Sequence, residues 1–248
     1  MGRSQRRPKL ARIDHAMTIV PRLIAIGGGG FTHGADTTME DFMLAQLPAA
    51  RPRIGFIGTA SRDDPVKIDR FHARFAGVCA VHTHLPMAAD AAQVHAWVEG
   101  LDIVYVGGGN TLRLVTHWRG EGIDQVMVTA ARRGVLMAGV SAGANVWFDH
   151  ALSDSGGMGL RPCRGIGMVA GSCCPHYSSE PRRQPAFAAC IAGGELPDGV
   201  AIDDGVAVLV DGCGVMRAFS AREGAGAYKV RRSGDAAVWA PLAQAITP

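Results

Sequence analysis

Short apolar runs alternate along the chain with segments of helical period. From residue 21 onward, strands are predicted at residues 23–26, 53–57, 80–85, 103–106 and 135–140. Helices are predicted between them at residues 38–47, 65–76, 91–98 and 111–133, the last one broken near Gly120 and Gly122. This alternation is typical of βαβ units, so the fold class is predicted as α/β, doubly wound, with a mostly parallel sheet and helices on both faces.

The pattern loosens after Phe148. Residues 149–162 are predicted as a loop rich in Gly and Ser, followed by a short strand that ends at His176 and a helix over 183–192. Short runs at 206–210, 215–219 and 227–230 predict a small antiparallel C-terminal edge. No linker marks a second domain. We therefore expect a disordered basic leader at 1–17, with Met17 as an alternative natural start, and a single α/β hydrolytic domain at 18–248.

Charge and cysteine content narrow the class of protein. The 248 residues carry a net charge of +3 with both signs scattered, and the basic cluster at 3–12 lacks aromatic residues, so no nucleic-acid partner is expected. That cluster also lacks the apolar segment of a secretory signal, and no run reaches the roughly 18 apolar residues of a membrane span. The 6 cysteines show no CxxC spacing, which is typical of reduced thiols in a cytoplasmic protein.

The run from Val135 to Asn145 predicts a buried strand, a tight turn and the start of a helix. Its centre, residues 139–143, has the G-x-S-x-G pattern of a nucleophile elbow, with Ser141 as the nucleophile. A short pattern like this also arises by chance in a chain with 33 glycines. The strand before it and the helix after it favour the elbow, because the helix start also offers the N–H of Ala142 to an oxyanion.

Four turns of small residues follow predicted strands, at residues 27–30, 58–61, 107–111 and 139–143. Parallel strands end at one edge of a sheet, so these turns should surround one cleft. Gly108 or Gly109 is expected to supply the second oxyanion donor, and one such donor typically stabilises a transition state by about 3 to 4 kcal/mol. A phosphate-binding turn is the competing interpretation, but no cluster has the full G-x-G-x-x-G or G-K-[ST] context.

The predicted general base is His176, because its strand should rejoin the cleft edge. His33, His82 and His84 are candidate metal ligands, but their spacing does not give a complete three-ligand set. No metal and no other cofactor is therefore expected.

The acid that orients the imidazole is predicted as Asp154, in the loop between nucleophile and base. Asp149, Glu180 and Asp204 are rival candidates, and each of the four is equally compatible with a solvated surface carboxylate.

These motifs together resemble the peptidase E family, the aspartyl dipeptidases. Residues 27–31, 59–61, 107–111, 139–145 and 174–177 occur there in the same order, and the likeness extends from about Arg22 to Gly212. The resemblance implies a sheet like that of class I glutamine amidotransferases, a Ser-His-acid triad, and hydrolysis of dipeptides with N-terminal aspartate. Those amidotransferases carry cysteine at the elbow, so Ser141 argues against their chemistry.

Two places depart from the best-known members of that family. Their acid lies two residues further along, where this chain has Gly156, whereas Asp154 between two serines resembles a distinct branch. The family also places a substrate-gripping arginine near residues 180–184, where Arg183 is the nearer match and Arg182 the other. With Asn110, these arginines are the residues expected to bind substrate.

The sequence therefore predicts a cytoplasmic serine hydrolase that cleaves Asp-Xaa peptides through an acyl-enzyme, with a small peptide as its partner and no membrane partner. Three further functions stay open: a cyanophycinase-like exopeptidase acting on β-linked aspartyl-arginine, a non-catalytic binder of acidic small molecules, and an ordinary esterase. The sequence leaves open the α or β preference, the second residue of the substrate, and a homodimer.

Overall fold

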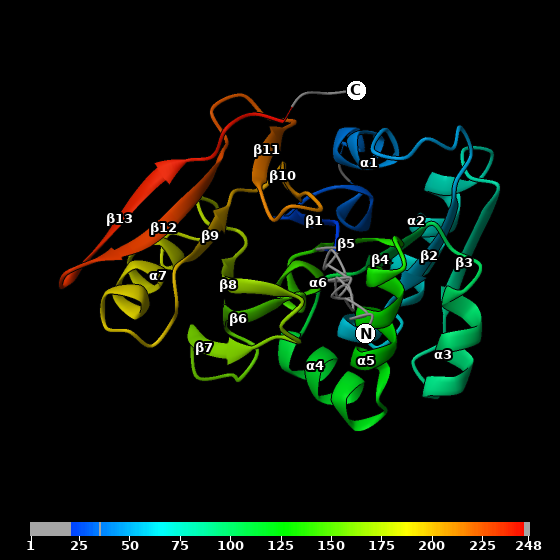
Figure 1. The fold of residues 1–248 in the computed structure, drawn as a ribbon, viewed down its shortest axis with the longest axis horizontal. Coiled ribbons are helices and arrows are strands. Elements are labelled where there is room, and N and C mark those ends of the chain that lie inside the picture. Colours follow the sequence, from blue (N-terminus) through cyan, green and yellow to red (C-terminus); the bar gives the residue numbers. More distant parts are fainter. Residues whose placement is uncertain (1–20, 35, 246–248) are drawn as a thin grey trace, which may run out of the picture.

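The computed structural model describes residues 21–34 and 36–245. The predicted basic leader at 1–17 lies outside the described residues. Two sheets organise the described chain (Figure 1). The first has seven strands in the order β11-β10-β1-β5-β4-β2-β3, and the second has six in the order β13-β12-β9-β8-β6-β7.

The first sheet is the mostly parallel sheet that the sequence predicts. Its strands are β1 (Leu23–Ile26), β2 (Arg53–Ile57), β3 (Val81–Leu85), β4 (Ile103–Val106), β5 (Leu136–Val140), β10 (Val206–Val210) and β11 (Met216–Ser220). Strands β1 to β5 pair in parallel. Strand β10 pairs antiparallel with both β1 and β11, so two of the three runs predicted for the antiparallel edge form it. The prediction that places the third run, 227–230, at this edge is wrong, because that run belongs to β12 of the second sheet and pairs with β9 and β13.

The helices begin and end close to their predicted bounds. They are α1 (Thr38–Leu44), α2 (Pro65–Phe75), α3 (Ala91–Val98), α4 (Thr111–Gly120), α5 (Ile123–Arg132), α6 (Ala142–Asn145) and α7 (Arg183–Ala192), with 3-10 turns at Phe31–His33 and Thr59–Ser61. Asp90 and Gln93 form a capping box that starts α3. Gly122 takes a left-handed φ of 70° and separates α4 from α5.

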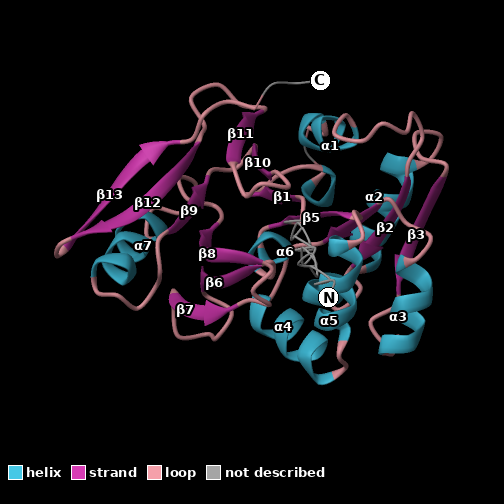
Figure 2. Cartoon of the chain, in the orientation of Figure 1, coloured by secondary structure: helices cyan, strands magenta, loops and turns pink. Residues whose placement is uncertain are grey.

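Each face of the first sheet packs against a different set of helices. On one face, Phe71 and Phe75 of α2 pack with Phe56 and Tyr105, and α1 adds Met39 to the same cluster. On the other face, side chains of α3, α4 and α5 pack against those of β4 and β5. Helices therefore cover both faces (Figure 2), and the predicted α/β class is confirmed. None of the described helices is long and apolar enough to cross a membrane.

The second sheet is the main departure from the prediction. It contains β6 (Phe148–Ser153), β7 (Arg161–Arg164), β8 (Val169–Cys174), β9 (Gly199–Ile202), β12 (Ala227–Ser233) and β13 (Ala236–Pro241). In residues 149–162 the predicted loop is therefore confined to 154–160, with strand on both sides of it, and the pattern predicts neither β9 nor β13. The sequence of β13, AAVWAP, is apolar throughout, and that of β7, RPCR, begins and ends with arginine, so neither has the alternation of apolar and polar residues that marks a half-buried strand.

Glu40 of α1 is a buried carboxyl group beneath the first glycine turn. Its side chain is 0% exposed, and the hydroxyl of Tyr105 donates to Oε1 over 3.3 Å. Its Oε2 has no hydrogen-bond partner among the described residues. Burial raises the pKa of Glu40 from the ordinary 4.5 to about 7.

Glu40→Gln is expected to stabilise the fold at alkaline pH. Between pH 4.5 and about 7 the folded state keeps a proton that the unfolded chain releases, so the free energy of unfolding of the wild type falls as pH rises. Above this window the loss approaches about 3 kcal/mol, which the neutral amide avoids. Urea unfolding at pH 5 and pH 8 measures the difference. An equal gain at both pH values would contradict the role of ionisation.

Candidate functional site

Ser141 lies in a sharp turn between β5 and α6. Its φ of 56° and ψ of −113° fall in a region that a residue with a side chain rarely adopts. A Cβ at Gly139 would lie 2.1 Å from the carbonyl oxygen of Gly143, and one at Gly143 would lie 2.0 Å from that of Val106. Glycine is thus required on both sides of the serine for strand and helix to approach this closely.

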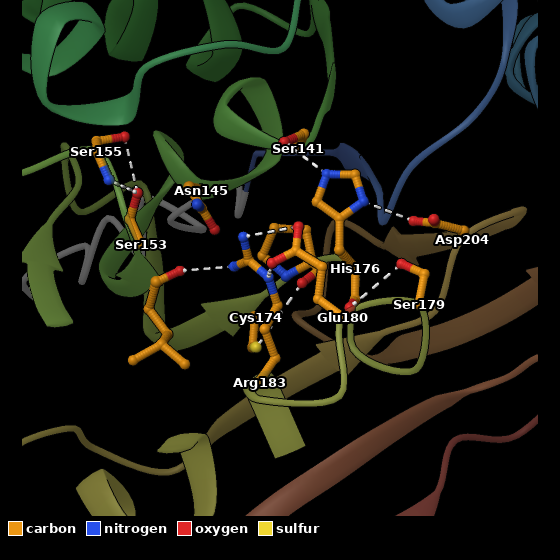
Figure 3. Close-up of polar contacts among 12 residues, drawn as sticks. Ser141, Asn145, Ser153, Ser155, Cys174, His176, Ser179, Glu180, Arg183 and Asp204 are labelled. Carbon is orange, nitrogen blue, oxygen red and sulfur yellow. Dashed lines mark hydrogen bonds and ion pairs between the residues drawn. The ribbon is translucent and has the colours of Figure 1, made fainter. Parts of the chain in front are cut away.

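A chain of hydrogen bonds runs from Ser141 through His176 to Asp204 (Figure 3). The Oγ of Ser141 is 2.9 Å from Nε2 of His176, and Nδ1 of the same ring is 2.7 Å from Oδ1 of Asp204. His176 lies two residues beyond β8 with a φ of 54°, and Asp204 lies between β9 and β10. The structure therefore brings the expected nucleophile and base together with a carboxylate behind them.

These contacts fix the protonation states of the site. A carboxylate only accepts hydrogen bonds, so the neutral imidazole carries its hydrogen on Nδ1, and Nε2 is left to accept from the Ser141 hydroxyl. Burial alone would raise the pKa of Asp204, but hydrogen bonds from His176 and Ser179 outweigh burial and lower this pKa below its usual value. Asp204 is then ionised at neutral pH, and the arrangement can withdraw a proton from the serine.

The structure places Asp154, the acid expected from the sequence, away from this chain of contacts. Asp154 is exposed in the turn after β6, where its carbonyl accepts from the N–H of Gly157 over 3.0 Å. Its neighbour Ser155 holds this turn against α4, because the Ser155 hydroxyl accepts from the N–H of Thr111 over 2.8 Å. The carboxylate that contacts His176 is that of Asp204, which the sequence offers as a rival candidate for the acid.

Asp149 and Glu180, the remaining candidates for the acid, have partners elsewhere. Oδ2 of Asp149 accepts from the N–H of Gly171 over 3.1 Å. Glu180 forms an ion pair with Arg183 over 2.7 Å. Of the four carboxylates considered, Asp204 is therefore the one that the imidazole reaches.

Gly28 makes room for the contact between His176 and Asp204. A Cβ at this position would lie 2.0 Å from Oδ1 of Asp204 and 2.6 Å from Nδ1 of His176. Gly28 and Asp204 also form a parallel β-bridge, which fixes the acid beside the end of β1. The small residue at position 28 therefore indicates that the acid lies beside this turn. The sequence alone does not show which carboxylate that is, because it does not show which segment pairs with the end of β1.

The second glycine turn lies against the nucleophile. A Cβ at Gly108 would be 3.2 Å from Cβ of Ser141, whereas one at Gly109 would meet the carbonyl oxygen of Ala60 at 2.3 Å. In the described part of the chain, the N–H of Gly108 has no backbone acceptor, and Ala142 is the first residue of α6, where an N–H has no partner within the helix. These two amides can therefore donate to an oxyanion.

Lys67 supports this turn, a role that the sequence does not predict. Its Nζ donates to the carbonyl oxygen of Gly108 over 3.0 Å, and burial lowers the pKa of this lysine. The contact links α2 to a turn 41 residues further along the chain, and no local sequence pattern marks such a pairing.

The three residues expected to bind substrate have different surroundings. Arg183 is 4% exposed, and its guanidinium donates to Glu180 and to the carbonyl oxygen of Leu152 over 3.3 Å. Arg182 is exposed at the start of α7. Asn110 caps α4, with its Oδ1 accepting from the N–H of Arg113 over 2.8 Å and its Nδ2 donating to Ser155. Both polar groups of this amide are thus engaged within the protein.

The remaining histidines considered for a metal do not form a ligand set. His82 and His84 on β3 each contact His72 of α2 over 2.9 Å. His33 contacts the carbonyl oxygen of Gly29 over 2.9 Å. Within residues 21–34 and 36–245, no group of three or more His, Cys, Asp or Glu side chains is arranged to hold a metal ion.

Comparison with known proteins places this site in a family. Residues 23–217 match the model of peptidase family S51. The chain belongs to this family. It is 37% identical over 211 residues to YgaJ of Bacillus subtilis (strain 168), itself called an uncharacterized peptidase, and the match covers 84% of this chain and 91% of YgaJ. A peptidase E of Streptomyces coelicolor is 32% identical over 126 residues, which is 48% of this chain and 46% of the relative.

A solved structure shows the same fold in another peptidase. The crystal structure of a peptidase from an acI-B1 Actinobacterium superposes with a TM-score of 0.72 at 14% sequence identity, covering 92% of this chain and 96% of the other. The family match and the relatives named peptidase E confirm the resemblance found in the sequence. This S51 chain is therefore a peptidase, and hence a hydrolase.

Proposed function

We propose that the protein is a serine peptidase that hydrolyses dipeptides or short peptides with N-terminal aspartate. The observation that carries the serine mechanism is the hydrogen-bonded chain from Ser141 through His176 to Asp204, with 2.9 Å and 2.7 Å between the bonded atoms. The aspartate preference is supported by the resemblance to peptidase E. A small peptide is thus the proposed partner.

In the proposed mechanism, Oγ of Ser141 attacks the carbonyl carbon of the Asp-Xaa bond while Nε2 of His176 takes the hydroxyl proton. Asp204 keeps the ring in the required tautomer and stabilises the imidazolium. The N–H groups of Ala142 and Gly108 donate to the oxyanion. His176 then protonates the leaving amine, an acyl-enzyme remains, and water deprotonated by His176 releases aspartate.

The substrate's aspartate side chain needs a cation, and we assign this role to Arg182. A guanidinium suits a carboxylate because it donates two parallel charge-assisted hydrogen bonds. Arg183 is buried and already donates to the carboxylate of Glu180 and to the carbonyl oxygen of Leu152, so we propose that it positions the segment between His176 and α7. Arg182 lies in the same segment and is exposed.

A cytoplasmic location is part of the proposal. The 6 cysteines of the chain are all free thiols in the structure, and three of them, Cys79, Cys173 and Cys174, are buried. Unpaired thiols in this number are typical of proteins from a reducing compartment.

The proposed function is tested by labelling with a fluorophosphonate, followed by peptide mapping. The expected product carries the phosphonyl group on Ser141, because an activated serine is the group that this reagent attacks. Turnover of α-Asp-Leu and β-Asp-Arg, measured side by side, then assigns the linkage. Labelling at another residue, or turnover of β-Asp-Arg alone, would contradict the proposal in its mechanism or in its substrate.

A further inference from the structure

A cavity of about 650 Å³ adjoins the segment that carries His176. Its lining includes aromatic and charged side chains, among them Tyr177, Tyr228, Trp239, Asp203, Arg222 and Glu223. The two carboxylates and one guanidinium among these six give them a net charge of −1. The proposed mechanism uses none of these six side chains.

Asp203 is a buried carboxylate with one unused oxygen. The side chain is 3% exposed, and its Oδ2 accepts from the N–H of Gly226 over 2.9 Å. Its Oδ1 has no hydrogen-bond partner in the part of the chain that the structure describes. A buried acceptor without a donor is costly, so Asp203, a residue of the cavity lining, is a candidate acceptor for a hydrogen bond from a molecule bound there.

The aromatic residues beside Asp203 favour a cation as that ligand. The rings of Tyr177 and Tyr228 lie 5.8 Å apart at 46°, and Trp239 of β13 is 62% exposed. Aromatic faces attract ammonium and guanidinium groups through their quadrupole, and they also cover the apolar stem of a long basic side chain.

The position of the cavity connects it with the leaving group of the reaction. Tyr177 directly follows His176, and Asp203 directly precedes Asp204. Arg222 also lines a smaller cavity of about 390 Å³, which reaches both His176 and Asp204. Because His176 must protonate the leaving amine, the residue that is released lies on the histidine's side of the cleft.

We propose that the larger cavity binds the cationic side chain of the residue released from the substrate, with Asp203 as its counter-ion. The preferred substrates are then peptides in which an arginine or lysine follows the scissile bond. Asp203 acts as a specificity-determining residue through contact with this side chain. The inference rests on the proposed function, since it assigns the cavity to the leaving part of a peptide substrate.

The first experiment compares Asp-Arg with Asp-citrulline, in which a neutral urea replaces the guanidinium at almost the same size. The wild type is expected to show kcat/KM about 10- to 100-fold higher for the arginine peptide, the effect of a charged hydrogen bond. In Asp203→Asn the amide oxygen can still accept from Gly226, but an NH₂ group replaces the unpaired oxygen. The ratio of the two kcat/KM values should then fall to about one.

Asp198→Asn is the matched control. Asp198 also accepts from one backbone N–H, that of Arg232 over 2.9 Å, and it is not part of the cavity lining. This variant should keep the ratio of the wild type. Equal kcat/KM values for the two peptides in the wild type would overturn the inference, even if Asp203→Asn does not fold.

A binding measurement separates this inference from the proposed function. Calorimetry with free L-arginine and L-citrulline needs no turnover, and the expected result is tighter binding of arginine that Asp203→Asn abolishes. If neither peptide is hydrolysed but arginine binds in this way, the peptidase proposal fails while the cation site stands. If both peptides are hydrolysed equally and arginine binds no better than citrulline, the cation site fails while the peptidase proposal stands.

Discussion

Replacing Ser141 by alanine is expected to lower kcat for Asp-Xaa hydrolysis by about 10⁶-fold. The substitution removes the oxygen that lies 2.9 Å from His176, and nothing else in the turn provides a nucleophile. Removal of His176 in addition should cost little more, because serine and histidine act as a unit and their losses do not add. The measurement is kcat with α-Asp-Leu for both single variants and the double variant.

Ser233→Ala controls for the loss of a hydroxyl. Ser233 is an exposed residue at the end of β12, away from the site, and its variant should keep the kcat of the wild type. A loss below about tenfold in Ser141→Ala would rule out the acyl-enzyme mechanism. Additive losses in the double variant would show that the contact between the two side chains is not used in the reaction.

Replacing Asp204 by asparagine is expected to lower kcat by about 10⁴-fold, with a much smaller change in KM. The amide has nearly the shape of the carboxylate, but its NH₂ group can donate to Nδ1 of His176. The ring would then carry its hydrogen on Nε2, where it can no longer accept the Ser141 proton. The loss should be measured at a pH where the wild type is fully active.

Asp154→Asn is the matched comparison, because Asp154 is the acid that the sequence alone favours. It is exposed and has no contact with His176, so its variant should retain the kcat of the wild type. The opposite result, a large loss at position 154 and a small one at 204, would mean that the hydrogen bond from His176 to Asp204 is not used in the reaction.

The first sheet could be predicted from the sequence because its central strands are buried on both faces. All five residues of β5 are buried, and so are all four of β1 and of β4. Such continuous apolar runs are typical of central parallel strands and contrast with the helical period between them. The nucleophile elbow could also be predicted, because the buried strand β5 runs directly into the G-x-S-x-G pattern and a helix, and this order requires a sharp turn.

The second sheet has a weaker signal in the sequence because much of it is open to solvent. In β13, five of the six residues are exposed, and β12 ends in three exposed residues. Asp204 could not be placed without this sheet, since it follows β9, a strand of four residues bounded by ordinary loop residues. The prediction of the acid therefore depended on position in the chain, and Asp154 was preferred on that basis alone.

Polar residues that cap helices look the same in a sequence as residues that bind substrate. Asn110 follows a glycine turn at the cleft, but it caps α4 and donates to Ser155. Arg183 lies where the family suggests a substrate-binding arginine, yet its 2.7 Å ion pair with Glu180 is a contact within one turn of chain. Deciding between these roles requires the direction of the side chain, which a linear pattern does not contain.

The proposed triad draws its parts from both sheets. Ser141 follows β5 of the first, His176 follows β8 of the second, and Asp204 lies where the chain crosses from β9 back to β10. During synthesis the serine turn therefore leaves the ribosome 35 residues ahead of the histidine, which is itself 28 residues ahead of the aspartate. If the proposed triad is the catalytic one, a growing chain that has folded only its first strands carries an unactivated serine, and hydrolysis can begin only after the later strands have been made and docked.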